Sequence, residues 1–189
     1  FMSSAMRSAG VCISLFVVLL FFCGLFVMGG VNKTFAPPVV MGDESIMSKK
    51  EYGTCTNPVQ SNLRYGCDEE KANKICCHNR HYAERAGYHS STSWAADTAG
   101  KGPVEYYDSV TGKLLFTAPI GRTESEFMQE SKAHGWPSFR DAEVNWDVVR
   151  ILPDGECVSV DGTHLGHNLP DKSGNRYCIN LVCVAGNPN

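Results

Sequence analysis

An uncharged apolar run, VCISLFVVLLFFCGLFVMGGV at residues 11–31, most constrains what this chain can fold into. A helix that spans a bilayer needs about 20 consecutive apolar residues, whereas the apolar core of a cleavable signal peptide has about 7–15. The run is apolar on every face, which argues against a helix packed on one side of a soluble domain. The sequence therefore predicts a transmembrane helix within residues 1–31, the lipid bilayer as a partner, and a separate domain outside the membrane.

The cysteines indicate the compartment of that domain. Seven of the nine cysteines follow the apolar run: Cys55, Cys67, Cys76, Cys77, Cys157, Cys178 and Cys183. Four of them fall within residues 55–77, and such a cluster beside a membrane anchor favours disulfides on the lumenal or extracellular side, an organelle membrane included. Cys76 and Cys77 are adjacent, so we expect them to have different partners. A net charge of −3 gives no basic surface for nucleic acid.

The remaining chain divides into a linker at 32–51, a Cys-rich and partly helical extension at 52–102, and a domain at 103–189. Helical spacing predicts a helix over 68–84, capped by Asp68, and Thr123 with Glu126 forms a capping box for a helix over 123–133. Residues 90–102 are small and polar and predict a loop. Alternation and turn residues predict a hairpin from 104–107 and 114–116, then strands at 144–152, 157–160 and 176–184.

The densest chemical pattern lies in the last third of the chain. On a strand, Arg176, Cys178 and Asn180 point to one face, and a guanidinium beside a thiol favours the thiolate. His164 and His167 bring two imidazoles close together for proton transfer or hydrogen bonding, and the carboxylate at position 171 could orient one of them. Taken alone, each of these residues also has a structural explanation. A cysteine in a strand is often a small buried residue, histidines near a glycine are often surface residues, and a tryptophan beside a proline often serves in packing.

Three motifs occur in order: GWPSF at 135–139, HLGH at 164–167 and RYCIN at 176–180. Together they resemble the B-type methionine-R-sulfoxide reductases over residues 104–184. Leu115-Phe116 and Pro170-Asp171 extend the match. The resemblance implies a mainly β fold of two small antiparallel sheets with flanking short helices.

The resemblance also implies roles and partners. The Cys178 thiolate attacks the sulfur of oxidised methionine in proteins, and no bound cofactor is needed. Trp136 and Phe139 bind the substrate, while the remaining residues organise the oxygen and deliver a proton: His164, His167, Asp171, Arg176 and Asn180. The sulfenic acid formed on Cys178 is then reduced by a second thiol and a thioredoxin-like protein. Disulfide or resolving candidates are Cys55, Cys67, Cys76, Cys77, Cys157 and Cys183.

The chain departs from the family at the structural zinc that many members hold with two CxxC pairs. The corresponding positions are Asp108, Thr111, Val158 and Asp161, so we expect no metal there. Two other functions remain open. One is a catalytically silent structural or assembly subunit of a larger membrane complex that keeps the reductase fold. The other, a metal-binding module using the two histidines and a cysteine, is weaker because the CxxC pairs are missing.

Overall fold

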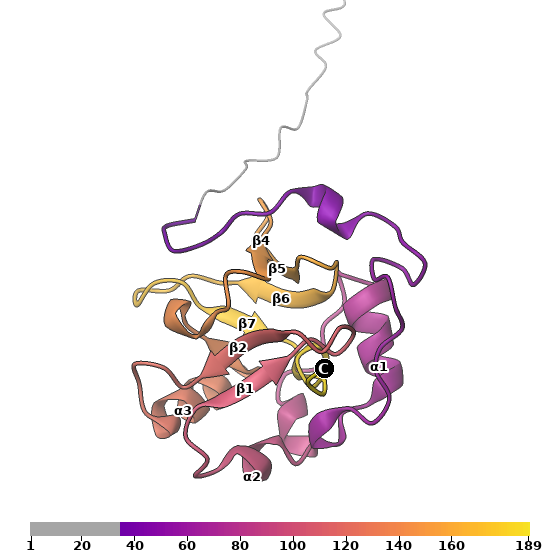
Figure 1. The fold of residues 1–189 in the computed structure, drawn as a ribbon. Coiled ribbons are helices and arrows are strands. Elements are labelled where there is room, and N and C mark those ends of the chain that lie inside the picture. The colour runs from indigo at the N-terminus through magenta and orange to yellow at the C-terminus, as the bar shows by residue number, and fades with distance from the viewer. Residues whose placement is uncertain (1–34) are drawn as a thin grey trace, which may run out of the picture. The chain divides into compact units, whose positions relative to one another are not determined.

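The computed structural model describes residues 35–189, and the predicted transmembrane helix within residues 1–31 lies outside this range. Within the described range, no helix has both the length and the apolar character needed to cross a bilayer. Two antiparallel sheets, of two and five strands, form the centre, and short helices surround them (Figure 1). This confirms the two predicted sheets, although the many short helices make the domain mixed α and β rather than mainly β.

The smaller sheet is the predicted hairpin, β1 (Val104–Tyr107) paired with β2 (Leu114–Ala118). The larger sheet has the order β3-β7-β6-β5-β4, and its strands are β3 (Ser138–Phe139), β4 (Val149–Ile151), β5 (Glu156–Ser159), β6 (His164–Asn168) and β7 (Tyr177–Ile179). Residues 40–42, within the predicted linker, cover the outer edge of β4: the Ile151 N–H donates to Val40 and its carbonyl accepts from Gly42. That edge is therefore not open to another strand.

The helices are short. They are α1 (Glu69–Asn73), which continues into a π-helical turn (Lys74–His78), α2 (Trp94–Thr98) and α3 (Glu124–His134). Single 3-10 turns occur at Glu44–Met47, Arg64–Gly66, Tyr88–Ser91, Asp141–Glu143 and Leu181–Cys183. The predicted loop at 90–102 is wrong, because it contains α2.

The helix predicted over 68–84 begins as expected, since the Asp68 side chain accepts from the Lys71 N–H. It ends six residues early, at His78, because Asn79 leaves helical geometry with φ −148° and ψ 85°. Residues 79–84 leave the helix because they bind the end of the larger sheet: the Glu84 carboxylate accepts the N–H groups of Leu181 and Val182.

Those same contacts shorten the last strand. The sequence predicts a strand over 176–184, but β7 stops at Ile179 and a 3-10 turn, Leu181–Cys183, follows. Backbone N–H groups that leave a sheet need another acceptor when they are buried. Glu84 supplies that acceptor for the first two residues of the turn, so the chain bends here instead of continuing as a strand.

The capping box of α3 is confirmed and positions the motif that follows it. The Thr123 side chain accepts from Glu126 N–H, and the Glu126 carboxylate accepts from Thr123 N–H. Gly135 ends the helix with φ 87°, in the left-handed region that favours glycine. A Cβ at Gly135 would stand 2.9 Å from the Cβ of Ala86, so the close approach also requires glycine.

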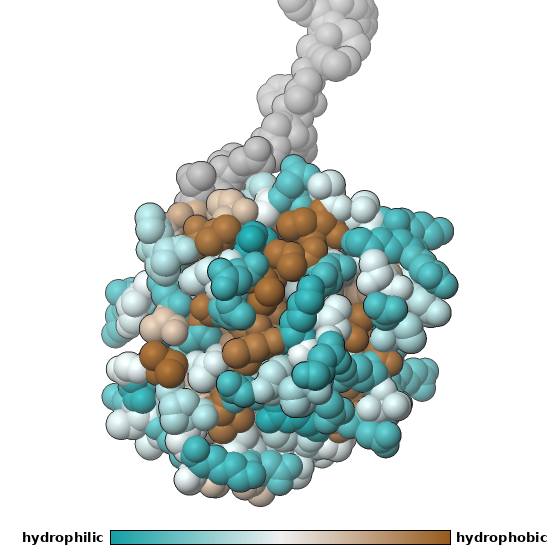
Figure 2. All heavy atoms as spheres, viewed as in Figure 1, coloured by the Kyte–Doolittle hydropathy of each residue, from teal (hydrophilic) through white to brown (hydrophobic). Residues whose placement is uncertain are grey.

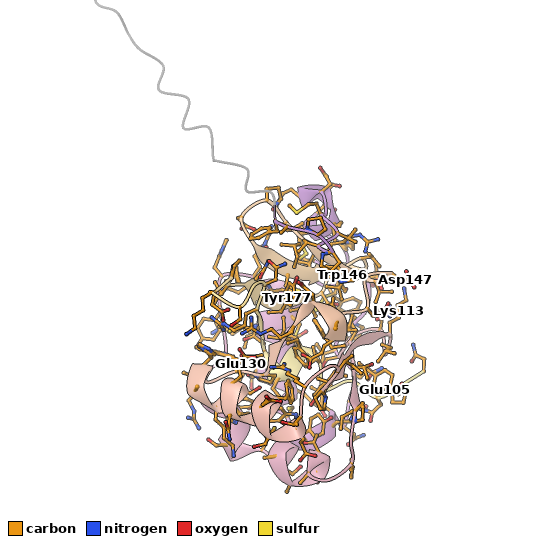
Figure 3. All side chains as sticks on the ribbon, turned by 90° about the vertical axis from the view of Figure 1, so that its left-hand side faces the viewer. Glu105, Lys113, Glu130, Trp146, Asp147 and Tyr177 are labelled. Atoms are coloured by element: carbon orange, nitrogen blue, oxygen red, sulfur yellow. A yellow bond between two sulfur atoms is a disulfide. The ribbon has the colours of Figure 1, made fainter. Side chains whose placement is uncertain are left out.

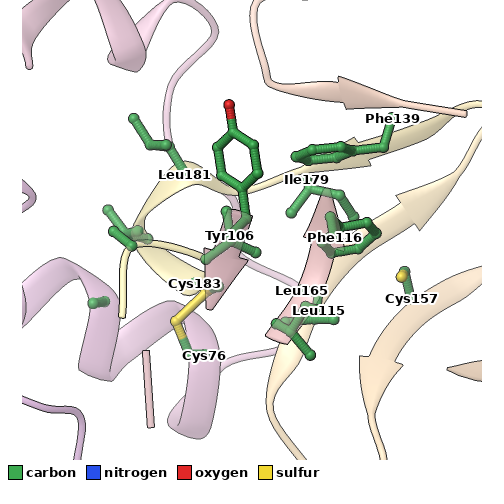
Figure 4. Close-up of a cluster of buried hydrophobic side chains, with 14 of the residues drawn as sticks. Cys76, Tyr106, Leu115, Phe116, Phe139, Cys157, Leu165, Ile179, Leu181 and Cys183 are labelled. Atoms are coloured by element: carbon green, nitrogen blue, oxygen red, sulfur yellow. A yellow bond between two sulfur atoms is a disulfide. The ribbon is translucent and has the colours of Figure 1, made fainter. Parts of the chain in front are cut away.

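Aromatic side chains fill the space between the two sheets (Figure 4). Phe139 of β3 stacks on Phe116 of β2, with ring centroids 4.3 Å apart, and meets Tyr106 of β1 edge-on at 5.1 Å. The Tyr106 hydroxyl accepts from the indole N–H of Trp94 in α2 at 3.1 Å, so this buried polar group is satisfied. The Cys-rich segment therefore shares one core with the sheets.

On the same face of the larger sheet as Phe139, Trp146 packs edge-on against Tyr177 of β7 at a centroid distance of 5.7 Å (Figure 3). The Tyr177 hydroxyl donates to Asp141 at 2.6 Å. On the face shown in Figure 2, most residues are hydrophilic, and hydrophobic residues lie between them near the middle of the face.

Two disulfides cross-link the domain, Cys55–Cys77 and Cys76–Cys183. The expected bridge within residues 55–77 is thus confirmed, as is the expectation that the adjacent Cys76 and Cys77 have different partners. All four cysteines are almost fully buried. The second bridge joins the π-helical turn to the turn after β7 (Figure 4), across a sequence separation of 107 residues.

We predict that the two bridges contribute unequally to stability. A cross-link that closes a longer loop removes more entropy from the unfolded chain, which corresponds to about 5 kcal/mol for Cys76–Cys183 and about 3 kcal/mol for Cys55–Cys77. The double variant Cys76→Ala/Cys183→Ala should therefore unfold at a lower urea concentration than Cys55→Ala/Cys77→Ala. The opposite ranking would show that native-state packing, and not loop closure, decides what each bridge contributes.

Candidate active site

A pocket of about 280 Å³ opens where β6 and β7 meet the Cys-rich segment. Its walls come from three parts of the chain: the two strands, the turn after α3, and residues 80–83. The lining residues are Arg80, His81, Tyr82, Ala83, Trp136, His164, Gly166, His167, Leu169, Cys178 and Asn180. Five of the predicted site residues are therefore brought together, although they come from three separate motifs.

Strand register places the reactive groups side by side. Glu156 of β5 lies opposite His167 of β6, which lies opposite Cys178 of β7, which lies opposite Ser138 of β3. Residues directly opposite one another on neighbouring strands share a face of the sheet. A single row across four strands thus carries a carboxylate, an imidazole, a thiol and a hydroxyl on one face.

Gly166, between the two histidines, is required by the same packing. It pairs with Ile179, and a Cβ built on it would lie 2.0 Å from the carbonyl oxygen of Cys178. Any larger residue would push β6 away from β7 and separate His167 from the thiol. The glycine of HLGH is therefore a consequence of close strand approach.

The Cys178 sulfur is half-buried and touches two polar groups. The Arg176 guanidinium donates to the sulfur through Nη1 at 2.5 Å, and the Ser138 hydroxyl lies 3.8 Å away. Arg176 is itself held by Asp171, whose Oδ2 is 3.3 Å from Nε. Hydrogen bonds from Arg140 lower the pKa of Asp171 to about 2, so this carboxylate is ionised at all pH values of interest.

The expected contact of Asp171 with an imidazole is absent from the described residues, and the carboxylate that does reach one is Glu156. Its Oε1 lies 2.6 Å from Nδ1 of His164, and both side chains are only 2% exposed. The other ring nitrogen, Nε2, is 3.5 Å from the Asn180 amide nitrogen. The His164 and His167 rings meet edge-on with centroids 5.8 Å apart. Burial and the neighbouring His164 lower the pKa of His167, which favours its neutral form.

Glu84 links the pocket wall to the end of β7. Its backbone N–H donates to the Asn180 side chain at 3.1 Å, and its carbonyl accepts the Trp136 indole N–H at 3.2 Å. Its carboxylate accepts from Leu181 and Val182. Burial raises the pKa of Glu84 to about 7, against the lowering effect of these two N–H groups.

Phe139 does not line the pocket. It alternates with Ser138 on β3, so its ring points to the opposite face and is fully buried against Phe116. Ser138 occupies the pocket side of the same strand, next to the thiol. Of the motif GWPSF, Trp136 and Ser138 therefore face the site, and Phe139 belongs to the core.

Sequence reasoning missed Glu156, Ser138, Glu84 and Arg80. Ser138 could have been found, because it stands one residue from Phe139 in a strand and must face the other way. Glu156 could not, because a bulge between Cys157 and Val158 shifts the register with β6 and removes any simple spacing to His164. The other two depend on the path of residues 79–84, which no local pattern indicates.

The three free cysteines of the described chain are Cys67, Cys157 and Cys178. Cys67 and Cys157 are buried and do not line the pocket, and burial raises the pKa of both thiols. Cys157 pairs with Gly166, in the row next to Cys178, so it lies on the opposite face of the sheet. The other resolving candidates, Cys55, Cys76, Cys77 and Cys183, are in disulfides.

At two of the four positions where the resemblance places zinc ligands, 108 and 161, the side chains make polar contacts, whereas Val158 packs in a small hydrophobic cluster. Asp108 is fully buried and accepts from the Val110 N–H and from the Thr163 hydroxyl, while Lys113 pairs with Asp161 at 2.8 Å. These contacts join the β1–β2 turn to the β5–β6 turn. Residues 35–189 contain no group of three side chains placed to hold a metal ion. A scan against protein-family models finds no match for the chain.

We predict that Glu84 makes stability fall as pH rises from about 4.5 to about 7. Its pKa is raised from 4.5 to about 7 in the folded protein, so the folded state binds more protons than the unfolded state between those values. At about 1.4 kcal/mol per pKa unit, the effect is at most about 3 kcal/mol. Urea unfolding across this pH range should show a shallower decline in Glu84→Gln than in the unaltered protein. Identical slopes would exclude Glu84 as the titrating group.

Proposed function

We propose that the protein reduces methionine-R-sulfoxide in proteins to methionine, with Cys178 as the nucleophile. The observation that carries this proposal is the environment of the sulfur. A guanidinium donates to it from Arg176, and Trp136, His164, His167 and Asn180 line the pocket into which it opens. These are side chains that the resemblance assigns to sulfoxide reduction.

The chemistry transfers one oxygen atom. The Cys178 thiolate attacks the sulfoxide sulfur while a proton passes to the sulfoxide oxygen, and the S–O bond to the substrate breaks as the oxygen moves to Cys178. The products are the thioether of methionine and a sulfenic acid on Cys178, so the substrate gains two electrons and the cysteine sulfur loses two.

Each lining residue has a role in that step. The Trp136 ring, fixed by its hydrogen bond to Glu84, supplies a flat apolar wall for the S-methyl group. The two imidazoles and the Asn180 amide supply polar groups for the sulfoxide oxygen. Arg176 stabilises the thiolate, and Asp171 with Arg140 keeps that guanidinium in place.

Return to the thiol requires an external reductant. One thiol condenses with the sulfenic acid, releasing water and leaving a mixed disulfide, and a second thiol then displaces Cys178. Two external thiols, as from a thioredoxin-like protein, serve this step, because neither of the other free cysteines of the described residues, Cys67 and Cys157, lines the pocket.

We place the domain on the lumenal or extracellular side of a membrane, anchored through residues 11–31. Two buried disulfides support an oxidising compartment. Oxidised methionines of proteins on that side of the membrane would then be the substrates.

We predict that Cys178→Ser loses all measurable reduction of methionine-R-sulfoxide, because a hydroxyl at this position is not ionised and is a far weaker nucleophile. The assay follows dabsylated methionine sulfoxide by chromatography, with residues 1–189 in detergent and dithiothreitol as reductant. Cys157→Ala is the matched control: it removes a thiol from the same sheet, on the opposite face, and should keep activity.

The unaltered protein should leave the S epimer untouched. Turnover by Cys178→Ser would exclude the proposed nucleophile. A chain that reduces neither epimer would favour the structural or assembly role instead.

A further inference from the structure

We infer that Glu156, held by Arg80, is a positioning residue that makes His164 the proton donor of the site, with Nε2 as the nitrogen that exchanges the proton. This inference rests on the proposed function. His164, and not His167, then delivers the proton. The groups that orient His164 are Glu156 and Arg80, and Arg80 belongs to the Cys-rich segment.

The contact between Glu156 and His164 is enclosed by protein. Oε1 and Nδ1 are 2.6 Å apart, and each side chain is 2% exposed. A buried carboxylate is stable only when donors satisfy it. Arg80 provides them on the second oxygen, with Nε 2.7 Å from Oε2 and a further contact from Nη2.

Arg80 has a second carboxylate on its outer side. Glu44, which is 62% exposed on its side chain, accepts from both terminal nitrogens of the guanidinium. The order from solvent to pocket is therefore Glu44, Arg80, Glu156 and His164. Burial raises the pKa of Glu156, but hydrogen bonds from His164 and Arg80 outweigh it and hold the pKa below its ordinary value.

An ionised carboxylate only accepts hydrogen bonds, so the imidazole nitrogen that faces it must carry a proton. Nδ1 of His164 is thereby fixed as N–H. The exchangeable proton belongs to Nε2, on the side of Asn180 and the pocket. When both nitrogens are protonated, Nε2–H can pass its proton to the sulfoxide oxygen, and the ring returns to the tautomer that Glu156 holds.

His167 is in a different environment. It lies directly opposite Cys178, and no carboxylate hydrogen bond to its ring is present in the described part of the chain. The charged and titratable groups that act on it are His164, Glu156, Asp154 and Arg80, and burial is the largest influence, lowering its pKa. A neutral His167 hydrogen-bonds the substrate oxygen, while His164 supplies the proton.

The Cys-rich segment is thus part of the site. Arg80 follows the π-helical turn, whose cysteines are bonded to Cys55 and Cys183. The two bridges fix the position from which the guanidinium reaches Glu156. Residues 81–83 continue along the pocket wall.

The test compares Glu156→Gln with Glu44→Gln, because both residues pair with the same arginine and only one touches His164. With residues 1–189 in detergent and dabsylated methionine-R-sulfoxide as substrate, we expect Glu156→Gln to lower kcat about 10- to 100-fold with KM little changed. The kcat profile should also move to lower pH, because the neutral amide no longer stabilises the protonated ring. Glu44→Gln should retain the kcat and the pH profile of the unaltered protein.

A second measurement does not depend on turnover. Nitrogen-15 NMR of the unaltered protein, with histidines assigned through His164→Gln, should show Nδ1 of His164 protonated and Nε2 unprotonated at high pH. The opposite tautomer would overturn the inference even if the enzyme is active, and so would an unchanged kcat and pH profile in Glu156→Gln. If the chain reduces neither epimer, the proposed function fails, while the tautomer still reports on Glu156.

Discussion

The arrangement of the site depends most on the hydrogen bonds of one buried residue, Glu84. It accepts the first two N–H groups of the Leu181–Cys183 turn, while the backbone of the same residue binds the Asn180 amide and the Trp136 indole. One residue thereby fixes the end of β7, one lining amide and one aromatic wall. Those three parts come from different stretches of the chain, and the hydrogen bonds of Glu84 fix their positions relative to one another.

Much of this architecture follows from local sequence rules. The hairpin β1–β2, the capped helix α3 and the alternation of Arg176, Cys178 and Asn180 are encoded by turn residues, a capping box and strand periodicity, and the structure has all three. The clustering of four cysteines within residues 55–77 also predicts a disulfide there without giving its partners, and the structure has one, Cys55–Cys77.

The remaining features could not be predicted from local sequence patterns, because tertiary contacts override the local propensity for helix or strand. Residues 79–84 continue a helical pattern, yet they leave the helix to bind the larger sheet. The strand predicted to end at 184 stops at Ile179 for the same reason. At Phe139, the motif was assigned to the substrate as a unit, whereas strand alternation places its last residue in the aromatic core. Within the site, the missing information was the strand register, which a bulge in β5 determines.

The hydrogen bonds of Asp108 connect two turns of the structure, one from each sheet. The resemblance places a metal between the β1–β2 turn and the β5–β6 turn, and here a carboxylate with hydroxyl and N–H donors joins the same two turns. Burial raises the pKa of Asp108, and the donors around it offset part of that effect. In this chain, the two turns are therefore joined by a buried polar network centred on Asp108.

The adjacent cysteines of the π-helical turn have a consequence for biosynthesis. Proteins are made from the N-terminus, so Cys55, Cys76 and Cys77 emerge together, whereas Cys183 follows Cys76 by 107 residues. If the Cys55–Cys77 bond forms in that interval, Cys76 is a free thiol beside it, and thiol–disulfide exchange can move the bond of Cys55 from Cys77 to Cys76. The two isomers close loops of almost equal length, so chain entropy does not choose between them. Only the completed core, with Cys183 delivered by the turn after β7, distinguishes the native pairing from its neighbour.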